Sequence, residues 1–329
     1  MKIKILFYGF RHSHINTLYK KVSASDLFEI VDCVEENTPA REAAEKNLGA
    51  SFSGRPYDEW LCEDIDVVAI GNAYGERGKV IIKALSAGKH IIADKPICTS
   101  VKELDEIEKL AGKNNLKIAC MLDLRYIFQA IKAKEIIHSG ELGEVRNVSF
   151  NGQHVIDYAH RPSWYFEKGM HGGTINDLAI HGIDLVRMIS GLEFAGTDGA
   201  RVWNSYAYKH EHFKDSALFM ARLSNGAGVI ADTSYSAPSQ GFSLPTYWEF
   251  RFWCEKGLLT FSYTLPDVTV YKEGVSEPVI YKRENVESDY LSEFIDEINS
   301  GRNEMTKNIL TSTRCALGIQ ALADSEVSK

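Results

Sequence analysis

The sequence predicts an α/β protein of two domains, the first built on a doubly wound parallel sheet and the second on a large, open, mainly antiparallel sheet. Over the first 124 residues, short β-branched runs alternate with amphipathic stretches of helical period. After residue 124, β-rich runs dominate, and turn sequences such as Asn225-Gly226 separate several of them. The chain has 329 residues, about twice the size of a typical domain, so two domains are expected.

The first part reads as a regular β-α-β series. Strands are predicted over 2–9, 27–35, 65–71, 89–96 and 116–124, and helices over 15–22, 39–48, 78–88 and 101–115. Gly49 and Gly88 end two of these helices. Crossover connections of this kind are right-handed and pair their strands in parallel.

The second part reads as hairpins interrupted by one helix. Strands are predicted over 145–155, 199–209, 216–226, 227–236, 247–257, 258–264 and 278–283, and helices over 127–140, 172–190, 288–301 and 305–327. We expect domains at 1–122 and 123–329, with the 305–327 helix as an element that can return to the first domain.

Composition excludes several classes of function. The apolar share of 44% and charged share of 25% are typical of a globular protein with a large core, and the net charge of -8 argues against nucleic acid or an anionic membrane as a partner. No apolar run is long enough for a membrane span, and the N-terminal run is too short for a signal peptide. The six cysteines lack zinc-type spacing, so we expect reduced thiols, a cytoplasmic protein and no metal site.

The first predicted strand ends in a degenerate glycine turn. Its sequence is Gly9-Phe10-Arg11-His12-Ser13-His14, whereas the dinucleotide fingerprint GxGxxG would place glycine at 9, 11 and 14. The strand-turn-helix context still suits a phosphate, because amides at a helix start can hold an anion and Arg11 adds positive charge. The alternative is that this turn has lost nucleotide binding.

Two acids follow the second predicted strand. Glu35 and Glu36 lie about 25 residues beyond Gly9, roughly where an acid hydrogen-bonds the adenosine ribose of NAD. An acid there repels a 2′-phosphate, so NAD is favoured. NADP stays the alternative, because the guanidinium of Arg11 could bind that phosphate. Either glutamate could also be a solvated acid at a strand end.

Two further motifs carry chemistry. Asp94-Lys95-Pro96 follows a strand at the carboxyl edge of the sheet, where open α/β folds bind ligands, and the proline gives Lys95 a defined direction. GGTINDLAIHGIDL (172–185) spaces Asp177, His181 and Asp184 four and three apart, on one face if the stretch is helical. Taken without the rest of the sequence, these three residues could also be core or capping residues, or could supply up to three ligands to a metal ion.

Together these features resemble the Gfo/Idh/MocA family of NAD(P)-dependent oxidoreductases over nearly the whole chain. AGKHIIADKP (87–96) is similar to the family's AGKHV-x-x-EKP, and GGTINDLAIHGIDL to its GGG-x-x-x-D-x-x-x-H-x-x-D. MLDLRY (121–126) and HSGELGEVR (138–146) also match. The chain departs from the family in DKP, in the two missing glycines, and in Gly71-Asn72-Ala73-Tyr74, which lacks a P-x-x-x-H.

The resemblance implies a Rossmann domain followed by an α/β domain whose sheet serves in oligomerisation and whose 172–190 helix closes the substrate cleft. It implies that Lys95 contacts the nicotinamide ribose and substrate, that Asp177 and His181 are the catalytic pair, and that Asp184 supports them. The cofactor candidates are Gly9, Phe10, Arg11, His12, Ser13, His14, Glu35, Glu36, Gly71, Asn72, Asp94, Lys95 and Pro96. The substrate candidates are Asp123, Arg125, His154, Tyr158, Trp164, His171 and Asp184.

The expected reaction is hydride transfer between a nicotinamide and a secondary alcohol or ketone of a sugar, sugar acid or cyclitol. An imidazole has a pKa near working pH, so His181 is the expected acid/base, and Lys95 would stabilise the alkoxide. Two alternatives stay open: an NAD-using glycosidase of the same fold, and a non-catalytic sugar- or nucleotide-binding regulator. The expected partners are a small polyol or sugar and further copies of the chain, as a dimer or tetramer.

Overall fold

The computed structural model of the chain describes residues 2–238, 247–286 and 289–327. These form two compact units. The first comprises Met1–Met121, Pro162–Gly172 and Tyr290–Leu310, and the second comprises Leu122–Arg161, Gly173–Asp289 and Thr311–Lys329. In the part of the chain that is described, no helix has the length and apolar character needed to cross a membrane.

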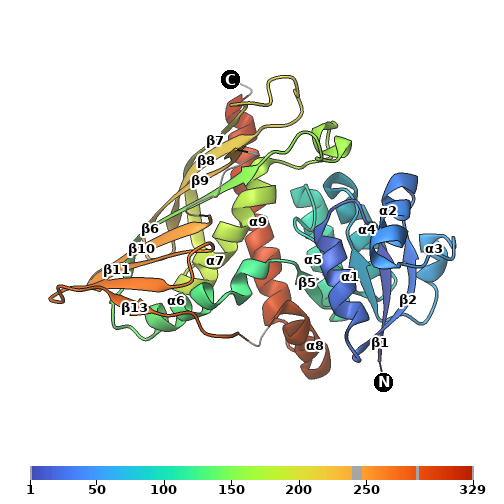
Figure 1. Ribbon diagram of the computed structural model, residues 1–329, viewed down its shortest axis with the longest axis horizontal. Coiled ribbons are helices and arrows are strands. Elements are labelled where there is room, and N and C mark those ends of the chain that lie inside the picture. The colour runs from blue at the N-terminus through green and yellow to red at the C-terminus, as the bar shows by residue number, and fades with distance from the viewer. Residues whose placement is uncertain (1, 239–246, 287–288, 328–329) are drawn as a thin grey trace. The chain divides into compact units, whose positions relative to one another are not determined.

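The first unit contains the predicted parallel sheet (Figure 1). Its elements in chain order are β1 (Ile3–Tyr8), α1 (His14–Ser23), β2 (Phe28–Val34), α2 (Thr38–Leu48), α3 (Tyr57–Trp60), β3 (Val67–Ile70), α4 (Tyr74–Ser86), β4 (His90–Ala93), α5 (Val101–Asn114), β5 (Ile118–Cys120) and, near the C-terminus, α8 (Tyr290–Ser300). The strand order is β2-β1-β3-β4-β5, and every pairing is parallel. The order changes direction at β1, so the switch point of this sheet lies at the carboxyl ends of β1 and β3.

Burial explains the sequence of these strands. The central strands are hidden on both sides, and all four residues of β3 are fully buried, which is why they read as continuous apolar runs. Helices cover the sheet: α1 contacts β2, α4 contacts β3 and β4, and α8 contacts β5.

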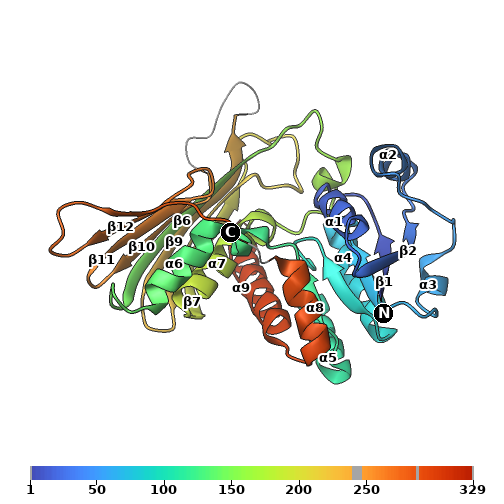
Figure 2. The same ribbon diagram turned by 60° about the horizontal axis from the view of Figure 1, so that its bottom comes forward.

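The second unit contains the eight-stranded sheet and the helices that cover it (Figure 2). Its elements are α6 (Phe128–His138), β6 (Val145–Val155), α7 (Ile180–Ser190), β7 (Phe194–Trp203), β8 (Ser216–Leu223), β9 (Gly228–Ala237), β10 (Glu249–Cys254), β11 (Gly257–Ser262), β12 (Val268–Lys272) and β13 (Val279–Tyr281). The order is β13-β12-β11-β10-β6-β9-β8-β7, and only the β6–β9 pair is parallel. Helices α6 and α7 pack on each other and on this sheet. Helix α9 (Glu304–Val327) contributes to both units.

The predicted fold class is confirmed, with local corrections. Helix α4 begins at Tyr74 rather than at residue 78, and strand β12 and the short helix α3 were not predicted. The helix predicted over 288–301 is seen as α8 from Tyr290, and Ser288 lies outside the described residues. The largest correction concerns 172–190, which opens with a π-helical turn over Ile175–Ala179 before α7 begins. Because a π turn holds more residues than an α turn, the α-helical periodicity that predicted one shared face does not apply between Asp177 and His181, although it applies between His181 and Asp184 within α7.

Gly182 allows α7 to approach the sheet closely. A Cβ atom at this position would lie 2.1 Å from the ring of Phe150 in β6. The helix therefore needs glycine here for packing, at the cost of helix propensity. Gly318 in α9 differs, because a Cβ there would meet no described atom within 4 Å.

These two glycines give a matched test of the packing. We expect Gly182→Ala to destabilise the protein by about 1–3 kcal/mol through overpacking. Gly318→Ala should stabilise it by about 0.5–1 kcal/mol through helix propensity. Chemical denaturation followed by circular dichroism measures both. Equal stability of the two variants would contradict the close approach of α7 to β6.

Candidate functional site

The turn between β1 and α1 begins at a glycine that cannot be replaced. Gly9 has a φ of +82°, which other residues rarely adopt. A Cβ atom on it would lie 2.5 Å from the backbone nitrogen of Asn72. The close approach of the turns that follow β1 and β3 therefore requires glycine at the first position of the fingerprint.

Backbone hydrogen bonds hold the rest of this turn. The amides of Arg11 and His12 both donate to the carbonyl oxygen of Gly71, at 3.0 and 3.2 Å. Helix α1 then begins at His14, with Ser13 as its N-cap and no acidic side chain in its first turn. No acid of α1 itself offsets the positive end of the helix dipole, although the carboxylate of Asp94 lies 3.0 Å from Nδ1 of His14.

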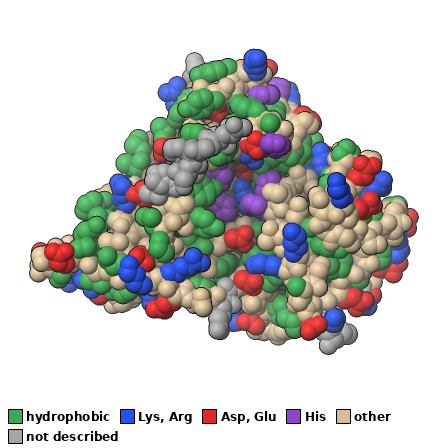
Figure 3. All heavy atoms as spheres, in the orientation of Figure 1, with side chains coloured by type: hydrophobic (Ala, Val, Ile, Leu, Met, Phe, Trp, Pro, Cys, Tyr) green, Lys and Arg blue, Asp and Glu red, His purple; other side chains and the backbone are tan. Residues whose placement is uncertain are grey.

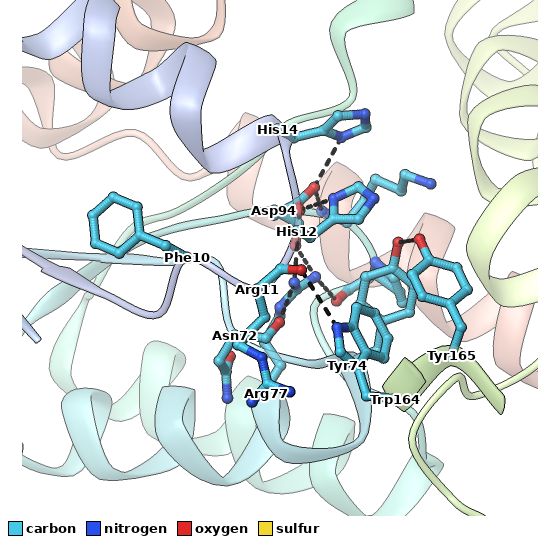
Figure 4. Close-up of polar contacts among 12 residues, drawn as sticks. Phe10, Arg11, His12, His14, Asn72, Tyr74, Arg77, Asp94, Trp164 and Tyr165 are labelled. Carbon is cyan, nitrogen blue, oxygen red and sulfur yellow. Dashed lines mark hydrogen bonds and ion pairs between the residues drawn. The ribbon is translucent and has the colours of Figure 1, made fainter. Parts of the chain in front are cut away.

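Asp94, directly after β4, is the centre of a buried polar cluster (Figure 4). Its Oδ2 atom lies 2.5 Å from Nδ1 of His12, and its Oδ1 atom lies 3.0 Å from Nδ1 of His14. The backbone amide of Lys95 also donates to Oδ1, at 2.7 Å. The Asp94 side chain is fully buried, whereas that of His14 is 40% exposed. Two side chains of the degenerate turn are thus tied to the start of the DKP segment.

Arg77 of α4 donates hydrogen bonds to the backbone next to this cluster. Its Nη1 atom donates to the carbonyl oxygens of Asp94 and Pro96, both at 2.9 Å, and its Nη2 atom donates to that of Asn72 at 2.6 Å. Nη2 also lies 3.6 Å from Oδ2 of Asp94. The guanidinium is fully buried and lies 4.8 Å from the centre of the Tyr74 ring. It therefore fixes the turns after β3 and β4 to each other.

The charges in the cluster follow from its surroundings. Burial alone would raise the pKa of Asp94, but the neighbouring His12, His14 and Arg77 hold it well below its usual range. Burial lowers the pKa of His12 to about 4, so that ring is uncharged at neutral pH. Because an ionised carboxylate only accepts hydrogen bonds, Nδ1 of His12 carries the ring proton and donates to Asp94.

Aromatic side chains surround the cluster within the first unit. The hydroxyls of Tyr74 and Tyr165 lie 2.7 Å apart, and Nε1 of Trp164 donates to the carbonyl oxygen of Arg11 at 3.4 Å. The His171 ring lies 5.2 Å from that of Tyr165. Trp164 and His171 are 1% and 2% exposed, so in this structure these two substrate candidates pack beside the glycine turn.

A pocket of about 590 Å³ lies at the carboxyl ends of β2 and β3. Its lining includes Tyr8, Glu35, Glu36, Arg41, Arg55, Tyr57, Asn72, Lys79 and Lys83. The carboxylate of Glu35 accepts hydrogen bonds from the amides of Phe10 at 2.5 Å and Asn37 at 2.7 Å, and Glu36 accepts one from the Tyr8 hydroxyl at 3.4 Å. The ring of Phe10 is buried. Glu35 and Glu36, the two acids that follow β2, thus both line this pocket.

In the second unit, Asp177 lies in the π-helical turn and His181 in the first turn of α7. The hydroxyl of Tyr235, in β9, donates a hydrogen bond to Oδ2 of Asp177. The His181 ring is 5.5 Å from the Trp248 ring, edge to face, and the residue is 8% exposed. Tyr235 and Trp248 were missed by sequence reasoning, because aromatic residues in predicted strands carry no motif.

His154 extends the same group of rings. Its Nε2 atom lies 2.6 Å from the hydroxyl of Tyr247, and its ring is 5.7 Å from that of Trp248. Of the substrate candidates, the structure thus brings His154 to the same tryptophan that His181 contacts. Trp248 itself has a φ of +51°, a strained value for a bulky residue.

Asp184, also in α7, has partners of its own. Its carboxylate accepts hydrogen bonds from Nε of Arg125 at 2.5 Å and from the Ser312 hydroxyl at 2.7 Å, and the aspartate is 1% exposed. Two substrate candidates, Asp184 and Arg125, therefore pair with each other inside the second unit. Asp123 is exposed, and Tyr158 is 43% exposed and stacks on His210.

Lys95 follows Asp94 and is 4% exposed, and its peptide bond to Pro96 is cis. It belongs to the first unit, whereas Asp177 and His181 belong to the second.

Two family models match the chain. Residues 4–121 match the model described as "Oxidoreductase family, NAD-binding Rossmann fold", and residues 130–260 match the "GFO/IDH/MocA C-terminal domain". Together they span most of the chain.

Individual relatives agree with these matches. Levoglucosan dehydrogenase of Pseudarthrobacter phenanthrenivorans is 31% identical over 41% of this chain and 35% of its own length. The NAD(+)-dependent scyllo-inositol 2-dehydrogenase of Bacillus subtilis is 26% identical over 68% of this chain and 64% of its own length. The matched stretches thus cover less than two thirds of these relatives.

Solved structures share the fold over nearly the whole chain. Aldose-aldose oxidoreductase of Caulobacter crescentus has a TM-score of 0.81 at 17% identity, over 99% of this chain and 98% of that one. Levoglucosan dehydrogenase in complex with NADH and levoglucosan has a TM-score of 0.80 at 18% identity, over 99% and 98%. At such identities the likeness shows the fold alone. The two family models, over residues 4–121 and 130–260, establish that this chain belongs to the Gfo/Idh/MocA family of oxidoreductases.

Proposed function

We propose that the protein is an NAD-dependent dehydrogenase or reductase that acts on a secondary alcohol or ketone of a sugar, sugar acid or cyclitol. The observation that carries this proposal is the match to both family models in a chain that keeps Lys95, Asp177 and His181 at the motif positions. The named relatives act on levoglucosan and scyllo-inositol, which supports a polyol or sugar substrate.

The first unit fits the cofactor. The pocket of about 590 Å³ takes the adenosine end, with Glu35 and Glu36 beside the ribose. The start of α1, at Ser13 and His14, holds the pyrophosphate, and Gly9 gives the backbone its close turn. The acids at the end of β2 favour NAD over NADP. When bound, the cofactor supplies hydride transfer to and from its nicotinamide ring.

The chain's own residues handle the proton and the charge. His181 accepts the hydroxyl proton in oxidation and returns it in reduction. Lys95 stabilises the developing alkoxide. Its backbone is held by the hydrogen bond from its amide to the Asp94 carboxylate and by the neighbouring Pro96. Asp177, held by the hydroxyl of Tyr235, positions the substrate hydroxyl or the imidazole.

Substitution of the proposed acid/base tests this assignment. We expect His181→Ala to lower kcat by about 10²-fold or more with little change in NADH affinity, because a general base typically contributes 10²–10⁴-fold. His138→Ala is the matched control, since His138 is an exposed histidine at the end of α6. Nicotinamide absorbance during turnover of a polyol and sugar panel measures both variants. Full activity of His181→Ala would remove His181 from the proposed role.

The same assay separates the alternatives. A dehydrogenase accumulates NADH in step with oxidised product. An NAD-using glycosidase would release sugar with no net change in absorbance, and a regulator would give neither signal.

We also propose that the protein is a homo-oligomer that associates through the exposed face of the large sheet. Met220 of β8 and Ile230 of β9 are directly paired across the strands, and they are 53% and 59% exposed. Leu218, Trp253, Tyr271 and Ile280, on β8, β10, β12 and β13, are each 43–52% exposed. Figure 3 shows hydrophobic side chains at the surface over these strands. So many exposed apolar side chains on one sheet are typical of an interface.

Charge reversal on the sheet tests this association. We expect Ile230→Glu to shift the protein to monomer in light scattering coupled to size exclusion, because the charge would be buried without a partner. Leu27→Glu, at a residue 57% exposed in the first unit, should leave the assembly unchanged. A monomeric wild type, or an oligomer unaffected by Ile230→Glu, would refute the interface.

We also propose that the protein is cytoplasmic, on the evidence of its cysteines. The structure pairs none of the six cysteines in a disulfide, which fits a reducing compartment such as the cytoplasm.

A further inference from the structure

We propose that His12, His14 and Asp94 form a binding site for a divalent transition-metal ion, for which Zn²⁺ is the best match. The turn after β1 supplies the two imidazoles in an H-x-H segment, and the turn after β4 supplies the carboxylate, 80 and 82 residues further along. The site lies wholly within the first unit, at the start of α1, where the proposed function also places the pyrophosphate, but the metal proposal does not rest on that function.

The geometry of the donors supports this site. One ligand atom from each residue lies within 4.8 Å of the others. The two carboxylate oxygens face different imidazoles, at 2.5 and 3.0 Å. Zn²⁺ with N and O ligands at about 2.0–2.2 Å needs donors about 3.4 Å apart in tetrahedral geometry. Side-chain adjustments of about 1 Å would therefore open the hydrogen-bonded cluster into a coordination site.

The chemistry of the donors selects the ion. Two imidazoles and one carboxylate suit zinc and similar first-row ions, whereas Ca²⁺ and Mg²⁺ prefer oxygen ligands alone. When Nδ1 of His12 binds the ion, its ring proton moves to Nε2, so the carboxylate need not take up a proton. Three protein ligands leave a coordination position open, and the 40% exposure of the His14 side chain gives solvent access to it.

The positive charge of Arg77 repels a bound cation, but Arg77 makes no hydrogen bond to the three proposed ligand side chains. Its guanidinium is 3.6 Å from Oδ2 of Asp94, and its hydrogen bonds go to the carbonyl oxygens of Asn72, Asp94 and Pro96. Its charge lowers the affinity for a cation, while its hydrogen bonds hold the backbone from Asp94 to Pro96 in place. Among the residues that the structure describes, no other group of three His, Cys, Asp or Glu side chains has this ligand geometry.

The test is a metal titration of tag-free protein stripped with EDTA and then desalted. Co²⁺ is followed by its visible absorption, and Zn²⁺ by isothermal titration calorimetry and by the rise in Tm that accompanies binding to the folded state. We expect one equivalent per chain and at least about a tenfold loss of affinity in His14→Ala. His138→Ala is the control for nonspecific binding to an exposed histidine and should bind like wild type.

His14→Ala changes a partly exposed residue, and circular dichroism checks its folding. If it is misfolded, His14→Gln replaces it, with the same tenfold loss expected. Absence of stoichiometric binding, or equal affinity in wild type and the His14 variant, would overturn the site. NADH titration in the presence of EDTA is a separate readout, so the failure of cofactor binding and the failure of metal binding are distinguishable.

Discussion

The arrangement of the first unit's site depends on the hydrogen bonds that the buried guanidinium of Arg77 donates to the backbone. It donates to carbonyl oxygens in the turns after β3 and β4 and faces the carboxylate of Asp94. A buried guanidinium without partners would destabilise the fold. Arg77 therefore needs the carbonyl oxygens of these two turns, and its hydrogen bonds in turn hold the two turns together. The position of Asp94 then fixes the amide of Lys95 and the rings of His12 and His14.

This network shows what holds a turn that has one fingerprint glycine. Gly9 is retained because a Cβ atom there would collide with Asn72. At the later positions, the amides of Arg11 and His12 are held by the carbonyl of Gly71, and His14 turns its side chain to Asp94. Hydrogen bonds to the turns after β3 and β4 therefore hold the positions where the fingerprint has its second and third glycines.

Much of this could be predicted from the sequence, and the remainder could not for identifiable reasons. The buried runs of the parallel strands and the motifs around Lys95 and His181 gave the fold and the family. The π-helical turn at Asp177 was not predictable from helical periodicity, and the Asp184–Arg125 pair joins residues 59 apart. The contact between His12 and Asp94 was equally hidden, because it spans 82 residues and follows from strand order.

The central claim is that the hydrogen-bonded turn between β1 and α1 still serves a dinucleotide. Titration of the protein with NADH and NADPH, followed by calorimetry in the presence of EDTA, tests it most directly. Our account predicts saturable binding of NADH, at least about tenfold tighter than that of NADPH, because the proposed function puts the acids Glu35 and Glu36 of this pocket beside the adenosine ribose. Absence of binding of either nucleotide at millimolar concentration would contradict it.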